Sequence, residues 1–209
     1  MSRSHKQEMK DQEYEMLLHI ETSEVQHVYE ATSHYHRYEP TSYGGLHLLL
    51  THYEWGRIPG RLVDFGCGKG RVSFYWHYML QRDAIGIERQ PRFFQEAQHN
   101  LKQYEQNFPD AKGKLTFIED DATRYPIDET DTIFYFFHPF SLPIFMKVIE
   151  NILQSLETFP RRIVLILYYA HEDYHFFLQQ QTMFQVEQVI EIPSLYENNS
   201  YEAFTIYSL

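Results

Sequence analysis

The sequence predicts an α/β protein with a doubly wound, Rossmann-like sheet of seven mostly parallel strands. From residue 58 onward, short apolar segments alternate with longer amphipathic ones, which is typical of parallel strands joined by helices. The last two apolar segments leave no room for a helix between them, which predicts an antiparallel last strand. With 209 residues, 43% of them hydrophobic, the chain is long enough for one compact unit with a full core.

The first 57 residues predict a helical cap that lies over the core unit, residues 58–209, and acts as a substrate lid. Residues 4–35 are polar, with scattered apolar side chains at helical spacing, and predict one or two helices. Residues 39–45, with one proline and two glycines, are expected to break this helix. A second helix is expected over residues 46–53, before the turn at Pro59-Gly60.

Strands and helices of the core unit follow from periodicity and from turn residues. Pro91 marks one helix start, because the N–H that proline lacks would have no partner inside the helix there. The expected strands are 61–65, 84–88, 115–118, 132–137, 162–169, 184–192 and 201–207. The expected helices are 71–81, 91–107, 142–157 and 173–181.

Composition restricts the partners and the compartment. The formal net charge is −11, which disfavours binding to bare nucleic acid. Cys67 is the only cysteine, so no disulfide framework is expected. No apolar segment approaches the ~20 residues that span a bilayer. We expect a soluble cytoplasmic protein, monomeric or homodimeric. Tyrosine and phenylalanine are abundant, and some are expected to line a cleft.

A glycine loop follows the first strand of the core unit. Gly66, Gly68 and Gly70 alternate directly after this apolar strand, so the backbone can turn sharply and approach a ligand closely. The next helix offers its unpaired N–H groups to the same ligand. Asp64, near the end of the strand, can hold the loop amides or attract an ammonium group.

Spacing narrows the identity of this ligand. A dinucleotide fingerprint, G-x-G-x-x-G, needs a glycine where this chain has Arg71, and a phosphate-binding P-loop sequence is absent. Glu88 ends the second strand, 22 positions after Gly66. An acidic residue at about this distance, ~20 positions, binds the ribose hydroxyls of an adenosine ligand. The sequence therefore predicts adenosine joined to a group other than pyrophosphate.

With these residues the chain resembles the class I S-adenosylmethionine-dependent methyltransferases, from about residue 58 to the C-terminus. Residues 63–71 resemble the first motif of that family, residues 85–88 the second, residues 117–122 the third and residues 131–140 the fourth. Residues 38–43 and the glycine run together are similar to small bacterial members without an assigned substrate.

The resemblance implies S-adenosylmethionine as the cofactor. Asp121 would contact the adenine amino group, with Asp120 as a near alternative. The implied cofactor-binding residues are Asp64, Gly66, Cys67, Gly68, Gly70, Glu88, Asp120, Asp121 and Ala122. Residues that would close over the cofactor or the substrate are Tyr38, Thr41, Tyr43, Pro139 and Phe140, although residues 38–43 also fit a simple helix-breaking turn.

His138-Pro139-Phe140 follows the fourth strand, at the sheet edge where open α/β sheets bind ligands. The segment resembles the Asn/Asp-Pro-Pro-aromatic motif of methyltransferases that act on planar amino groups, but has histidine for asparagine and a single proline. His138 is the candidate catalytic residue, accepting a proton or a hydrogen bond from the acceptor. The alternative is a proline-terminated strand whose aromatic side chains pack in the core.

A competing signal is His171-Glu172-Asp173-Tyr174-His175, which matches the zinc-protease pattern H-E-x-x-H. Asp173 is charged where such a helix should bury an apolar residue, and the motif begins directly after a strand. A polar helix start explains the same residues, with Glu172 and Asp173 complementing the helix dipole. A zinc metalloprotease therefore stays a remote alternative, and no metal is expected.

The sequence thus predicts in-line methyl transfer from S-adenosylmethionine, a reaction that depends mainly on alignment and the exclusion of water. A small-molecule acceptor fits the acidic charge and short chain best, and a protein side chain comes second. A domain that binds the cofactor without catalysis is the alternative function.

Overall fold

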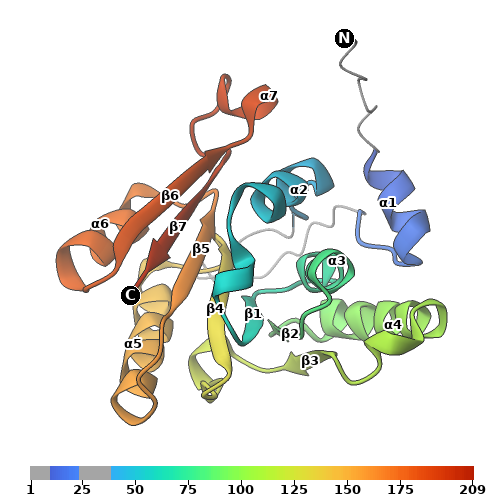
Figure 1. The fold of residues 1–209 in the computed structure, drawn as a ribbon, viewed down its shortest axis with the longest axis horizontal. Coiled ribbons are helices and arrows are strands. Elements are labelled where there is room, and N and C mark those ends of the chain that lie inside the picture. Colours follow the sequence, from blue (N-terminus) through green and yellow to red (C-terminus); the bar gives the residue numbers. More distant parts are fainter. Residues whose placement is uncertain (1–9, 24–38) are drawn as a thin grey trace.

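The computed structural model describes residues 10–23 and 39–209, which build a seven-stranded sheet with helices on both faces (Figure 1). The strand order is β3-β2-β1-β4-β5-β7-β6. The strands are β1 (Arg61–Phe65), β2 (Ala84–Glu88), β3 (Leu115–Glu119), β4 (Asp131–Phe137), β5 (Val164–Tyr168), β6 (Gln185–Glu191) and β7 (Ala203–Ser208). Strands β1 to β5 are parallel, and β7 is antiparallel to both of its neighbours. The predicted doubly wound sheet with an antiparallel last strand is confirmed.

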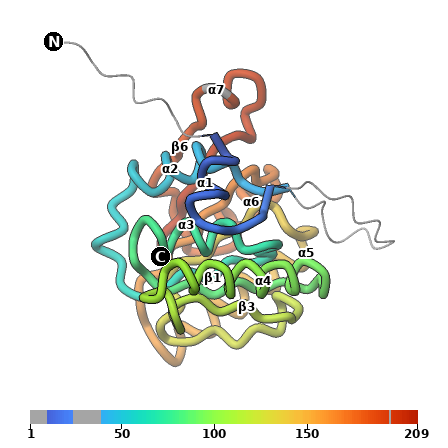
Figure 2. The backbone as a smooth tube through the Cα atoms, turned by 90° about the vertical axis from the view of Figure 1, so that its right-hand side faces the viewer, coloured from blue at the N-terminus to red at the C-terminus, as the bar shows by residue number. Residues whose placement is uncertain are grey.

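Two hydrophobic clusters fill the space between the sheet and its two helical layers. Side chains of α1 to α4 belong to one cluster, and those of α5 and α6 to the other. In both views α1 and α2 lie beside α3 (Figure 2). The helices are α1 (Asp11–Leu18), α2 (Tyr43–His52), α3 (Arg71–Leu80), α4 (Pro91–Asn107), α5 (Leu142–Thr158), α6 (Glu172–Gln181) and α7 (Pro193–Tyr196). No helix in the described part of the chain is long and apolar enough to cross a bilayer.

The start of α2 differs from the prediction. Residues 43–45 were expected to break a helix, yet they form its first turn. Ser42 explains the difference, because its Oγ accepts a hydrogen bond from the Gly45 backbone N–H at 3.1 Å and caps the helix. A second difference is the short helix α7 between the last two strands, where no helix was expected. Of the helices expected over residues 4–35, α1 is described, whereas residues 4–9 and 24–35 lie outside the described ranges.

Hydrogen bonds attach the glycine loop to the sheet edge. The backbone N–H groups of Gly66 and Cys67 both donate to the Ile87 carbonyl, at 2.9 and 3.1 Å. The carboxyl end of β1 is thereby held against that of β2, and β4 lies on the other side of β1. All three strands are parallel, so their carboxyl ends meet at one edge of the sheet, the usual place for a ligand in this architecture.

Candidate functional site

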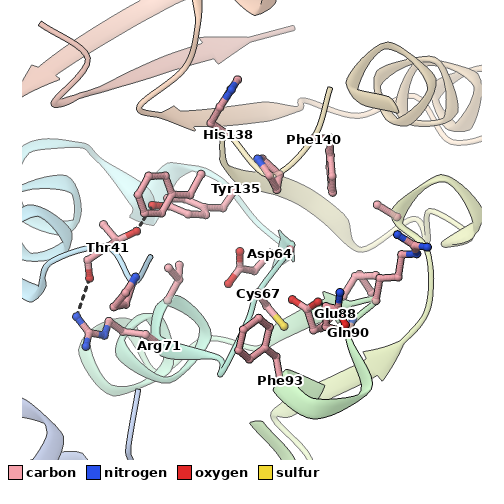
Figure 3. Close-up of a pocket in the computed structure, with 18 of the residues that line it drawn as sticks. Thr41, Asp64, Cys67, Arg71, Glu88, Gln90, Phe93, Tyr135, His138 and Phe140 are labelled. Atoms are coloured by element: carbon pink, nitrogen blue, oxygen red, sulfur yellow. Dashed lines mark hydrogen bonds between the residues drawn. The ribbon is translucent and has the colours of Figure 1, made fainter. Parts of the chain in front are cut away.

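A cavity of about 1200 Å³, counting its open mouth, lies at this sheet edge (Figure 3). Six of the nine implied cofactor residues line it: Asp64, Gly66, Cys67, Glu88, Asp120 and Ala122. The candidate catalytic residue His138 and three of the candidate lid residues, Thr41, Pro139 and Phe140, also line it. Four other predicted residues, Gly68, Gly70, Asp121 and Tyr43, are not part of the lining, and Tyr38 lies outside the described residues.

Two glycines of the loop are required for different reasons. Gly66 has a φ of +78°, and a Cβ there would lie 2.7 Å from the Pro139 Cβ. Gly66 therefore lets the loop pack against the segment after β4. Gly70 has a φ of +90°, and its Cβ would lie 2.6 Å from the Phe117 ring. A side chain at position 70 would collide with the core and strain the backbone, so this glycine is required even without a ligand.

The Glu88 carboxylate holds the backbone on both sides of the pocket. It accepts hydrogen bonds from the N–H of Gly68 at 2.8 Å and of Gln90 at 2.7 Å, one on each oxygen. Glu88 thus fixes the glycine loop and also faces the cavity.

Asp64 is a buried carboxylate in the cavity wall, 2% exposed. Its Oδ2 has no hydrogen-bond partner among the described residues. Burial, and to a smaller extent the nearby charge of Glu88, raises the pKa of Asp64 well above its usual range. A cationic ligand group beside this carboxylate would offset both effects.

The acidic pair after β3 has divided roles. Asp121 Oδ1 accepts hydrogen bonds from the N–H and the hydroxyl of Thr123, at 2.9 and 2.6 Å, and so caps the turn at 122–124. Asp120 lines the cavity and pairs with Arg124 at 2.8 Å. Of the two candidates for the adenine contact, only Asp120 faces the cavity in the described structure.

The opposite wall joins the N-terminal part of the chain to β4. Thr41 is buried, and its hydroxyl lies 2.7 Å from that of Tyr135 (Figure 3). Thr41 thus reaches the cavity, as the lid prediction requires. Tyr43 instead lies fully buried between helices, where its hydroxyl donates to Glu15 at 2.9 Å.

Arg71, which was not a predicted site residue, connects this wall to α1. It is 3% exposed and lines the cavity, yet all five of its N–H donors have partners within the protein. These partners are Thr22 Oγ1, Asp11 Oδ2, the Thr41 carbonyl, Glu15 Oε1 and Ser23 Oγ, at 2.6–3.3 Å. A cation at the first position of a helix opposes the helix dipole, and this was the signal in the sequence that could have indicated buried acidic partners.

His138 stands at the cavity edge in a left-handed backbone conformation, with a φ of +37°. Such a conformation costs a residue other than glycine about 1–3 kcal/mol, so surrounding contacts must maintain it. The imidazole is stacked on that of His171, with ring centroids 4.3 Å apart and an interplanar angle of 7°. Tyr174 lies against the same ring at 5.2 Å.

The two histidines of the H-E-x-x-H motif have separate partners. His171 is the N-cap residue of α6 and stacks on His138. His175 Nδ1 lies 2.8 Å from the Tyr207 hydroxyl, and burial lowers the pKa of His175. Within residues 10–23 and 39–209, no group of three or more histidine, cysteine or acidic side chains could hold a metal ion.

Residues 62–158 match a family described as a methyltransferase domain. No curated protein matches the sequence. Solved structures share the fold at low identity. A methyltransferase from Aquifex aeolicus is 14% identical, with 78% of this chain and 88% of that chain covered and a TM-score of 0.56. A TehB-like methyltransferase from Corynebacterium glutamicum is 18% identical, and the match covers 79% of this chain and 86% of that chain, with a TM-score of 0.51.

An RNA methyltransferase from Salinibacter ruber, solved with S-adenosyl-L-homocysteine, is 16% identical to this chain. The match covers 81% of this chain and 92% of the Salinibacter chain, with a TM-score of 0.50. Residues 62–158 thus match a methyltransferase domain, and the sheet that contains them has the fold of solved methyltransferases. This is the fold of the class I type, which uses S-adenosylmethionine.

Proposed function

We propose that the protein transfers the methyl group of S-adenosylmethionine to a small molecule that carries no negative charge. The observation behind this proposal is the buried Asp64 carboxylate, which faces the cavity beside Glu88. Asp64 suits the ammonium group of the cofactor and Glu88 suits its ribose hydroxyls. Asp120 and Ala122 would meet the adenine, beside the ring of Phe93. The backbone of Gly66 and Cys67 would run along the methionine end.

The chemistry requires alignment more than activation. A sulfonium methyl group is already reactive, so holding a nucleophile in line with it and excluding water supplies roughly 7–11 kcal/mol of barrier lowering. Thr41, Tyr135, Phe137 and the 138–140 segment form the wall that faces away from the adenine end. In this arrangement His138 would accept a proton or a hydrogen bond from the acceptor.

Charge at this end of the cavity supports a neutral or cationic acceptor. Glu39 contributes a carboxylate to the lining. Arg71 donates to the Thr41 carbonyl, and its other N–H groups are also occupied by protein groups. A phosphate or a carboxylate on the acceptor would therefore be repelled by Glu39, and Arg71 is already engaged by protein carboxylates. The net charge of −11 adds a further penalty for nucleic acid. A protein side chain is the second candidate acceptor.

Residues 1–57 would act as the substrate lid, because Thr41 joins the cavity wall and α1 is tied to Arg71. The single cysteine and the acidic surface support a cytoplasmic location. We further propose that the lid and the 138–140 segment together determine which acceptor is methylated.

Calorimetry tests the cofactor assignment first. S-adenosylmethionine and S-adenosylhomocysteine should bind with micromolar affinity, and NAD should not bind measurably, because the loop lacks the dinucleotide spacing. Transfer is then measured with methyl-tritiated S-adenosylmethionine and the small-molecule fraction of a cell extract. Tritium in that fraction supports the proposal. Binding without transfer to this fraction or to extract protein would favour the inactive module, and binding of NAD would contradict the cofactor site.

Asp64→Asn should lower the affinity for S-adenosylhomocysteine by about 1.5–3 kcal/mol, the range for a hydrogen bond to a charged group. The matched control ligand is 5′-methylthioadenosine, which lacks the amino-acid end and should bind both forms alike. Equal weakening of both ligands would place the ammonium group elsewhere.

The same carboxylate predicts a pH dependence. Since burial raises the pKa of Asp64 in the folded protein, its contribution to stability is fully present below the unfolded pKa and is lost as pH rises through the folded pKa. Affinity for the ammonium group should change in the opposite direction and rise as Asp64 ionises. Both slopes should disappear in Asp64→Asn, which calorimetry and urea titrations across the pH range would show.

A further inference from the structure

We propose that His171 is a positioning residue that holds the His138 imidazole at the acceptor end of the cavity. The inference rests on the proposed function of that site. It assigns a role to the first histidine of the H-E-x-x-H motif, which the methyl-transfer chemistry itself does not use.

The backbone brings the two histidines together through a matched pair of turns. Strands β4 and β5 are parallel neighbours, and their last residues, Phe137 and Tyr168, are register partners. The residues that follow them, His138 and Tyr169, both have left-handed conformations, with φ of +37° and +53°. Both segments therefore leave the sheet through a residue in a left-handed conformation, and His171 comes two residues after Tyr169.

The side chains then form a layered stack. The His138 and His171 rings are nearly parallel, at 7°, with centroids 4.3 Å apart. Tyr201, from the segment before β7, lies against His171 at 5.5 Å and 23°. Tyr169 lies 5.6 Å from Tyr201, and its hydroxyl accepts a hydrogen bond from Asn199 at 2.8 Å. Three loops thus hold the imidazole that faces the cavity.

Helix capping does not explain the residue at position 171. His171 is the N-cap of α6, a position where serine, asparagine or aspartate would accept a hydrogen bond from the first turn. Its side chain makes no such bond. The residue is exposed, and its ring stacks on those of His138 and Tyr201. Replacement by alanine should therefore leave α6 intact and remove only the stack.

The experiment compares three variants of the full chain: His171→Ala, His171→Phe and the control His175→Ala. Phenylalanine keeps a flat ring but cannot titrate or bind metal. His175 is the matched control, because it belongs to the same helix and contacts Tyr207 instead of the cavity. Tritium transfer from S-adenosylmethionine to the small-molecule extract fraction gives the rate, and calorimetry gives the affinity for S-adenosylhomocysteine. Spectra of histidine-labelled protein give the His138 ring signals, identified by their loss in His138→Ala.

We expect His171→Ala to lower the transfer rate by about 100-fold, the cost of misplacing a reacting group by roughly 1 Å, with cofactor affinity unchanged. His171→Phe should retain most of the rate, and His175→Ala nearly all of it. The His138 signals should move in His171→Ala and stay in place in His175→Ala.

Three results would overturn the proposal: transfer at the wild-type rate in His171→Ala, a phenylalanine variant no better than alanine, or an equal loss in His175→Ala. If the wild type binds cofactor but transfers no methyl group, the proposed function fails. The His138 ring signals then still test whether His171 positions that ring. Signals that do not move in His171→Ala would contradict the positioning role.

Discussion

Replacing His138 with alanine should lower methyl transfer by about 10²–10⁴, the usual contribution of a positioned acid–base group. Affinity for S-adenosylmethionine should stay nearly intact, because Asp64 and Glu88 face the cavity from other strands. The transfer rate at saturating cofactor, measured together with calorimetric affinity, separates these two quantities.

His138→Asn distinguishes the two roles open to this residue. Asparagine tolerates the left-handed backbone better than most residues and accepts a hydrogen bond without titrating. Activity retained with asparagine but lost with alanine would mean that the side chain orients the acceptor. Loss in both would mean that it removes a proton. If alanine lowers the melting temperature and leaves turnover unchanged, the ring only packs against Tyr174 and His171.

Replacing Arg71 with methionine should lower the free energy of unfolding by about 3–5 kcal/mol, the cost of removing one partner from a buried ion pair. Glu15 is only 11% exposed and would lose its cationic partner, at 3.3 Å, and Asp11 would lose a contact of 2.7 Å. Urea titration measures the change. The matched control is Arg82→Met, because Arg82 donates to the backbone carbonyls of Trp55 and Gly60 and not to a carboxylate.

A double variant tests the reason for this loss. Arg71→Met combined with Glu15→Gln should recover part of the stability, since glutamine removes the unpaired buried charge and keeps an oxygen that can accept from Tyr43 or Thr22. If Arg71→Met is no worse than Arg82→Met, or if the double variant recovers nothing, the buried arginine does not hold α1 through its charge.

Elements of the core were predictable because local signals set their limits. Strand β2 and helix α4 begin and end as predicted, since Pro91 fixes the helix start and a short apolar segment precedes it. The start of α2 was not predictable from composition, because Gly44 and Gly45 indicate a break. The Ser42 cap, together with burial of Gly45 and Leu46, outweighs the glycine cost of about 1 kcal/mol each.

The residues of the site likewise divide into those that local signals predict and those that depend on distant contacts. Asp64, Gly66 and Glu88 stand at strand ends, so their positions followed from spacing alone. Whether Asp120 or Asp121 faces the cavity depends on a turn that the sequence does not fix. The contacts of Arg71 and His171 join segments far apart in the chain, and one sequence does not show which distant residues will meet.

Two of the bonds that trypsin recognises, after Lys69 and after Arg71, lie at the end of the glycine loop and the start of α3. Both side chains are buried, 2% and 3% exposed, and both are paired with carboxylates. Neither can enter a protease while the loop is closed, so cleavage there measures how often the loop opens. A ligand that binds only the closed loop must slow this cleavage. Proteolysis can therefore report occupancy of the cavity before any methyl acceptor is known.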